Sequence, residues 1–166
     1  MSLPQIAEIK NNWLYQQVDV QFPTKESLIG LEVYKKAVES RQYKRIEHNT
    51  GEQASFAQDD IFLVDFHRLT VMFSLLQSTQ WHDSSDQDMI VEFLTQIIYS
   101  EPCALYLGFK SGEPVAAAII SQHEGSVLVS DVVVKSGDES ETAAFVSAVL
   151  TKYDHTTQAE ALYLEF

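Results

Sequence analysis

This sequence is short of the residues on which several common structures depend. It has one cysteine, Cys103, so a disulfide within the chain is excluded. No apolar run approaches the ~20 residues that a membrane-spanning helix needs, and the N-terminus lacks the basic start and apolar stretch of a secretory signal. We therefore expect a cytoplasmic protein with no membrane association, in which Cys103 is a buried and inert thiol.

Positive charge is also scarce. The chain has 11 Lys and Arg against 24 Asp and Glu, a net charge of −13. Residues 1–45 hold seven basic and five acidic residues, whereas residues 46–166 hold four and nineteen. Nucleic acids and acidic membranes require clustered positive charge, so we expect neither as a partner. The acids favour a cationic small molecule or a Lys-bearing protein as a partner, or they serve only to keep the surface soluble.

Apolar residues recur at regular spacings along the chain, and 166 residues are enough to form one domain with a single buried core. The first half predicts helices more than strands. Thr24 is a typical helix cap, and Pro23 ends the alternating pattern before it. The predicted elements are helices at about 5–17, 25–42, 66–78 and 85–99, a strand at 18–22, a loop at 48–60, and a short strand or a helix entry capped by Asp65 at 61–66.

The second half predicts a sheet. Three apolar runs at 104–110, 115–121 and 126–134 are separated by short glycine-containing turns, which is typical of an antiparallel meander. Asp138 or Ser140 then caps a helix that ends near Tyr153. A last apolar strand at 161–166 is expected to run parallel to the strand before that helix. The fold class is thus α/β (α+β), a mixed sheet with an antiparallel meander flanked by helices.

Motifs of other enzyme classes are missing. The sequence has no Gly-X-Ser-X-Gly, no Walker-type loop and no two-glycine dinucleotide turn. Histidines His67, His82 and His123 lie far apart without ligand spacing, so we predict no metal site.

The order of elements from Phe66 to Phe166 resembles the GCN5-related N-acetyltransferase (GNAT) family. Gly112–Ala118 is similar to the family's hairpin, and Val127–Val134 is similar to its central strand. The resemblance implies a GNAT-like core over residues 61–166, with residues 1–50 as an N-terminal segment, and acetyl-CoA as the cofactor. It implies that the cofactor contacts the end of the central strand and the loop after it. These residues are Val132, Val133, Val134, Ser136, Gly137 and Ser140.

The loop departs from the family's pattern. In the family, glycines let backbone N–H groups approach the cofactor's pyrophosphate at a helix N-terminus. Here Gly137 is the one glycine left, and Asp138, Glu139 and Glu141 surround it. Each acid should weaken pyrophosphate binding by about 1 kcal/mol at a screened surface. We therefore expect poor acetyl-CoA binding, and the acids equally suit a role as helix caps.

The chain also stops before the family's last helix and strands. The segment from Val18 to Ile46 is similar to that missing piece, which suggests that it completes the sheet, by permutation or by exchange in a homodimer. The resemblance then implies that Tyr34 is a general acid that protonates the leaving thiolate. An aromatic residue at that spacing is more often part of a core. Asp131 could act as or position a general base for an amine, or it could be a solvent-facing residue of the strand.

Three functions stay open at this point. The chain is an acetyltransferase-like enzyme with an altered pyrophosphate loop, or a non-catalytic GNAT-fold module for binding or assembly. It could also be an interaction domain of the profilin or PAS kind, because meanders of this type recur in unrelated proteins.

Overall fold

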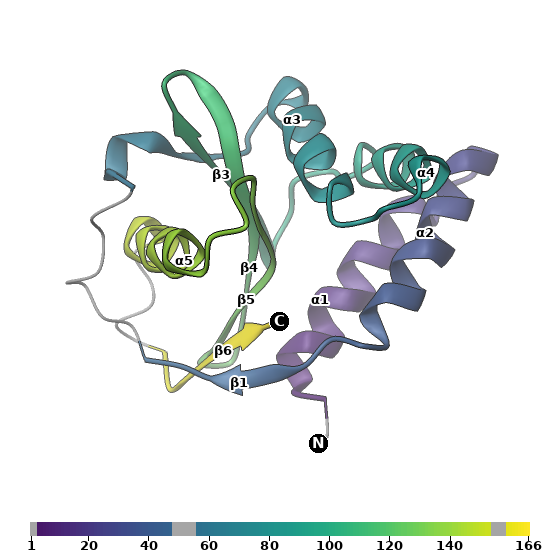
Figure 1. The fold of residues 1–166 in the computed structure, drawn as a ribbon. Helices are drawn as coiled ribbons and strands as arrows, with labels where there is room; N and C mark the ends of the chain where they lie inside the picture. The colour runs from purple at the N-terminus through teal and green to yellow at the C-terminus, as the bar shows by residue number, and fades with distance from the viewer. Residues whose placement is uncertain (1–2, 48–55, 154–158) are drawn as a thin grey trace.

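The computed structural model describes residues 3–47, 56–153 and 159–166 (Figure 1). The predicted loop at 48–60 therefore lies mostly outside the described residues. The helices are α1 (Gln5–Tyr15), η1 (Gln16–Val18), α2 (Lys25–Val38), η2 (Gln58–Asp60), α3 (His67–Ser78), α4 (Ser84–Leu94) and α5 (Glu139–Tyr153). The strands are β1 (Tyr43–Arg45), β2 (Ile61–Leu63), β3 (Cys103–Lys110), β4 (Glu113–His123), β5 (Ser126–Val134) and β6 (Ala161–Glu165).

The strands form one mixed sheet in the order β1-β6-β5-β4-β3-β2. Strands β3, β4 and β5 are the predicted antiparallel meander. Strand β6 pairs with β5 in parallel, as predicted, from Ser126 opposite Ala161 to Val129 opposite Leu164. The α+β fold class, with helices flanking a mixed sheet, is therefore confirmed.

Helices cover both faces of the sheet. Figure 1 shows α5 alone on one face and α1, α2, α3 and α4 on the other. Side chains alternate between these layers, as they must in a pleated strand: Leu105 and Leu107 join the core under the four helices, while Tyr106 joins the core under α5. The central strands are apolar on both sides because both sides are buried.

The N-terminal segment adds the edge strand β1 to the sheet. Thr24 caps α2 by accepting the Ser27 N–H at 3.1 Å, and the helix ends at Val38, four residues before the predicted end. Strand β1 then pairs antiparallel with β6, with Tyr43 opposite Glu165. Residues 43–45 thus lie at the edge of the final strand within this chain.

Helix α2 packs closely on α4, and one glycine makes this possible. A Cβ atom built on Gly30 would lie 2.0 Å from the backbone oxygen of Met89. No side chain larger than hydrogen fits there unless the helices separate. The close contact holds α2, and Tyr34 one turn further along it, against the sheet layer.

Three predictions of local structure are wrong. Val18–Phe22 is not a strand, because η1 continues from α1 and residues 20–22 form a bend with Phe22 84% exposed. The predicted helix at 85–99 ends at Leu94. Asp65 does not cap α3, whose N-cap residue is Phe66 without a side-chain hydrogen bond. Apolar spacing alone misplaced these boundaries, since a short amphipathic run fits several structures.

Among the described residues, every helix is too short or too polar to cross a membrane.

Candidate functional site: a buried ionic cluster

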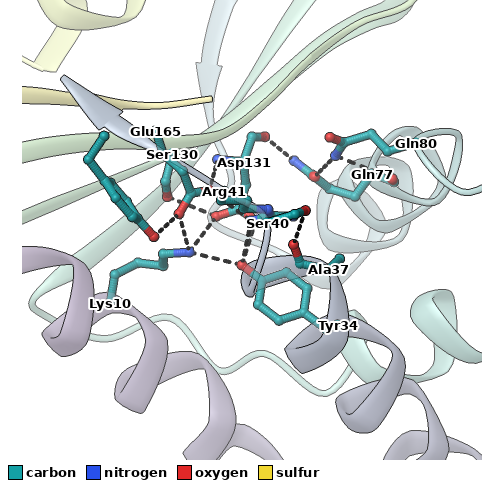
Figure 2. Close-up of polar contacts among 11 residues, drawn as sticks. Lys10, Tyr34, Ala37, Ser40, Arg41, Gln77, Gln80, Ser130, Asp131 and Glu165 are labelled. Carbon is teal, nitrogen blue, oxygen red and sulfur yellow. Dashed lines mark hydrogen bonds and ion pairs between the residues drawn. The ribbon is translucent and has the colours of Figure 1, made fainter. Parts of the chain in front are cut away.

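Six ionisable side chains meet between the sheet and the N-terminal helices, and we call them the ionic cluster. Figure 2 labels five of them, all but Tyr43, and shows how these five converge from separate elements of the fold. They are Lys10 from α1, Tyr34 from α2, Arg41 from the turn after α2, Tyr43 from β1, Asp131 from β5 and Glu165 from β6. Two cations and two carboxylates lie together, so the cluster has no net formal charge.

Lys10 is at the centre of the cluster and is fully buried. Its Nζ atom lies 3.1 Å from carboxylate oxygens of both Asp131 and Glu165. It also donates to the Tyr34 hydroxyl at 2.9 Å. The three N–H groups of the ammonium thus have three acceptors, which is what a lysine needs when no water reaches it.

Arg41 closes the cluster on the side toward solvent. Its Nη1 atom lies 2.7 Å from an oxygen of Asp131 and 2.7 Å from an oxygen of Glu165. The Tyr34 hydroxyl donates to Asp131 at 2.6 Å, and the Tyr43 hydroxyl donates to Glu165 at 2.8 Å. Each carboxylate therefore has both cations and one phenol as partners.

A β-bulge in β5 turns Asp131 toward the helices. Asp131 has a φ of +53°, and the register against β4 shifts between Ala117 and Ile119. Before the bulge Val127 and Val129 face α5, whereas after it Val134 faces α5 and Val133 faces the other layer. One extra residue thus reverses the alternation. The bulge lets a carboxylate leave an apolar strand and reach Lys10, and the interpretation of Asp131 as solvent-facing is wrong.

Electrostatics keep the cluster charged despite burial. Burial alone favours the neutral acid, but Lys10 and then Arg41 outweigh it, so the pKa of Asp131 lies well below its usual value. Burial disfavours the charged form of Lys10, yet Asp131 is the first of the neighbours that hold its pKa well above the ordinary value. Burial raises the pKa of Tyr34, and Asp131 raises it further. The phenol therefore stays protonated near neutral pH.

The two residues proposed as catalytic from the sequence are in direct contact. Tyr34 and Asp131 lie 97 positions apart in the chain, and the 2.6 Å hydrogen bond joins them. Tyr34 is also packed in the core under the helices, with its ring 5.7 Å from that of Phe93. The pair has the chemical groups of a proton donor and an acceptor, but both are enclosed by the cluster.

The cofactor contacts implied by the resemblance lie on the same strand and beyond it. Val133 and Val134 are buried on opposite faces, and Val132 is partly buried. Ser136 and Gly137 are exposed in the turn that leads to α5, where Gly137 has a φ of +70°, and Ser140 is exposed in the first turn of α5. Backbone pairing continues into this turn, since the Lys135 N–H donates to the Val115 carbonyl.

Asp138 occupies the N-terminus of α5. One of its carboxylate oxygens accepts the Ser140 N–H at 2.7 Å and the Glu141 N–H at 3.3 Å. Hydrogen bonds from Ser140, first its hydroxyl and then its N–H, lower the pKa of Asp138. These N–H groups are the ones that would face an anion at a helix N-terminus. Asp138 caps the helix as predicted, because its carboxylate accepts hydrogen bonds from these same N–H groups.

Sequence reasoning missed four members of the cluster: Lys10, Arg41, Tyr43 and Glu165. Two of them carried a signal. Lys10 follows Ile6 and precedes Leu14 at a spacing of four, so a cation sits on an apolar helix face. Glu165 lies in an otherwise apolar final strand. A charged residue in the buried stripe of each element predicts a partner of opposite charge, although neither pattern identifies it.

Other candidates lie outside the cluster. Cys103 is buried, and burial raises the pKa of its thiol to about 12, which agrees with an inert role. Within residues 3–47, 56–153 and 159–166, no three His, Cys, Asp or Glu side chains are close enough to hold a metal ion.

No protein-family model matches this sequence, and no curated protein matches it.

Proposed function

We propose that this chain is a non-catalytic module with a GNAT-like architecture that works by binding or assembly. The proposal draws on the order of elements from β2 through α3, α4, the meander and α5 to β6. That order follows the family to which the sequence bears a resemblance. The edge strand β1 next to β6 supplies a strand where the family has its later ones.

One observation carries the non-catalytic part of the proposal. In the GNAT family, the backbone at the end of the central strand pairs with the pantetheine arm of the cofactor, where the parallel neighbour diverges. Here the pairing of β5 with β6 ends at Val129 and Leu164. Just beyond, the Asp131 N–H donates to the Glu165 carboxylate at 3.2 Å, and the Gln77 side chain donates to the Asp131 carbonyl at 2.5 Å. Both backbone groups already have partners within the chain.

The acidic loop supports the same proposal. A pyrophosphate at the N-terminus of α5 would compete with the Asp138 carboxylate for two N–H groups. It would also meet the charge of Glu139 and that of Glu141, which Lys110 partly offsets at 2.5 Å. Binding of acetyl-CoA therefore requires the loss of existing hydrogen bonds and the approach of like charges.

An acetyltransferase-like enzyme is the second candidate, and the contact between Tyr34 and Asp131 favours it. A phenol can in principle protonate a leaving thiolate, but burial and Asp131 raise the pKa of Tyr34 and so make it a weaker acid. This candidate requires the cluster to open so that substrate reaches the phenol, because Tyr34 is 1% exposed.

Titration with acetyl-CoA separates the two candidates. A ligand at 100 times its Kd stabilises a folded protein by about 2.7 kcal/mol. We expect no rise in Tm and no calorimetric heat at millimolar acetyl-CoA, for the reasons above. A saturable rise in Tm with a micromolar Kd would contradict the non-catalytic proposal.

A loop variant tests whether the acids near α5 or the occupied backbone groups of Asp131 prevent acetyl-CoA binding. The triple substitution Asp138→Ser, Glu139→Ser and Glu141→Ser removes the negative charge and keeps a hydroxyl cap on α5. We expect this variant also not to bind acetyl-CoA, because the backbone groups of Asp131 stay occupied. A gain of micromolar affinity in the variant alone would mean that the acids, and not the ionic cluster, exclude the cofactor.

The partner that we propose is a cation, either a small molecule or a Lys-bearing protein. Residues 46–166 have a net charge of −15, and such a field attracts cations and repels nucleic acid. Binding of spermine, measured by calorimetry at low and at physiological salt, tests the small-molecule form. Saturable binding that weakens with salt is expected, and a lack of binding at low salt would exclude this class of partner.

A further inference from the structure

A hollow of about 760 Å³ opens beside the ionic cluster. All its lining residues belong to residues 1–45, where basic residues outnumber acidic ones. Its volume is in the range of sites that hold small organic molecules. Apolar groups from Leu3, Pro4 and Val38 form part of its wall. The remaining lining residues are polar or aromatic, namely Tyr15, Lys35, Glu39, Arg41, Gln42 and Tyr43.

Arg41 presents unused hydrogen-bond donors to this hollow. Its three hydrogen bonds, to Tyr34, Asp131 and Glu165, all come from Nη1. Within the described residues, Nε and Nη2 have no hydrogen-bond partner. Among these residues, the one fully buried side-chain N or O atom that lacks a partner is Oδ1 of Asn11, so neither Arg41 atom is fully buried. Both atoms therefore remain accessible, although the Arg41 side chain is only 13% exposed. A guanidinium held in place by two carboxylates presents one free edge.

Two further groups in the hollow suit the same ligand. Lys35 lies with its Nζ atom 5.0 Å from the centre of the Tyr15 ring, which places a cation over an aromatic wall. The Tyr15 hydroxyl has no hydrogen-bond partner among the described residues. Burial raises the pKa of Tyr15, so the phenol remains a donor near neutral pH. The exposed carboxylate of Glu39 opposes an anion, but solvent screens it.

We propose that this hollow binds a small organic anion, a carboxylate or a phosphate ester with an apolar body, through the free edge of Arg41. Both head groups have two oxygen atoms that can accept two parallel hydrogen bonds from a guanidinium. Lys35 adds a second positive charge, and the apolar wall takes the body of the ligand. The site is separate from the α5 N-terminus and does not depend on the proposed function.

The net charge of the chain does not exclude this site. At physiological salt, exposed charges more than about 8 Å away are largely screened. The carboxylates nearest to Arg41 are already paired with Lys10, so the anion meets a neutral cluster with a cationic edge. Long-range repulsion slows association of an anion more than it weakens the bound state.

Titration of the full chain with benzoate and with phenyl phosphate tests the proposal, with benzylamine as the cationic control. The readout is the NMR signal of the Arg41 Nε–H group together with the backbone amides. We expect saturable shifts at Arg41, Gln42 and Val38 with at least one anion and none with benzylamine. Tighter binding of one probe identifies the head group as carboxylate or phosphate. Shifts with neither anion, or equal shifts with benzylamine, would overturn the proposal.

Matched lysine variants avoid the risk that an Arg41 variant fails to fold. Lys35→Gln should weaken the anion by about 2- to 5-fold, as expected for one exposed charge. Lys36→Gln changes the next residue, which lines a different hollow, and should leave affinity unchanged. Val38→Trp should fill the site and abolish binding while the amide spectrum stays folded. Equal effects of the two lysine variants, or full binding by Val38→Trp, would contradict the site.

Discussion

Asp131 and Glu165 in the ionic cluster contrast with Asp138, Glu139 and Glu141 in the loop and first turn at the N-terminus of α5. The first two carboxylates have side chains 2% exposed, and each contacts two cations and a phenol. At the N-terminus of α5, Asp138 and Glu139 are exposed, and the Glu141 side chain is 27% exposed and pairs with Lys110 at 2.5 Å. The same chemical group is therefore costly to change where it is buried, and cheaper to change near the surface, where water can replace a lost partner.

The difference implies that changes in the cluster are far more costly than changes in the loop. A buried charge that loses its partner cannot be solvated by water, whereas an exposed charge can. The four predictions below separate the two regions by stability, beginning with the largest effect.

Lys10→Met should produce the largest loss of stability. The substitution keeps an apolar stem of similar length but leaves Asp131 and Glu165 with Arg41 as their one cation. Removing one partner of a buried pair costs about 3–5 kcal/mol, and we expect that loss in urea unfolding. Lys44→Met, at an exposed position in β1, is the control and should change stability by about 0.5 kcal/mol or less. A loss below about 1 kcal/mol at Lys10 would contradict the role given to the cluster.

Tyr34→Phe should have an intermediate effect. The ring stays in the core, but Asp131 loses a donor and Lys10 loses an acceptor, so buried polar groups are left without a partner. Such a loss costs about 1–3 kcal/mol. Tyr163→Phe is a suitable control, because no hydrogen bond of its hydroxyl is found among the described residues. Equal unfolding free energies for the two variants would show that the Tyr34 hydroxyl adds nothing to the fold.

Acid should reduce the stability that the cluster contributes by more than the stability that the acids near the N-terminus of α5 contribute. The pKa of Asp131 is lowered in the folded state, so its contribution to stability is present above the unfolded pKa of about 3.9 and is lost as pH falls toward the folded value. We expect the unfolding free energy to fall below about pH 4. Asp131→Asn should flatten this slope, whereas Asp138→Asn should leave most of it. Identical slopes for wild type and Asp131→Asn would contradict the assignment.

Asp138→Ala should cause the smallest loss. The substitution removes the acceptor for the Ser140 and Glu141 N–H groups, but water reaches both of them in the exposed turn. A cap of this kind shifts Tm by about 2–4 °C in a domain of this size. A shift as large as that of Lys10→Met would remove the distinction between the two regions.

Local patterns in the sequence were enough to predict much of the fold. Alternation and short glycine turns predicted the meander, and the apolar run at 161–166 predicted the parallel strand. Thr24 and Asp138 marked helix starts by a hydrogen bond that each makes with its own neighbours. These features are local, so a window of a few residues contains their cause.

The cluster was harder to predict because its partners are distant in sequence. Asp131 and Tyr34 were both singled out, but nothing in either pattern indicated that they touch. Their contact depends on the bulge in β5 and on the approach of α2 to α4 at Gly30. Lys10 and Glu165 are 155 positions apart, and their pairing follows from the whole sheet. Long-range contacts of this kind are set by topology rather than by local spacing.

A double-mutant cycle between Lys10 and Glu165 tests the central claim most directly. The free energy of unfolding is measured for wild type, Lys10→Met, Glu165→Gln and the double variant. If the cluster is one coupled unit, the double variant should be more stable than the sum of the single losses predicts, by about 1–3 kcal/mol. Strictly additive losses, within about 0.5 kcal/mol, would contradict a buried network that joins the N-terminal helices to the sheet.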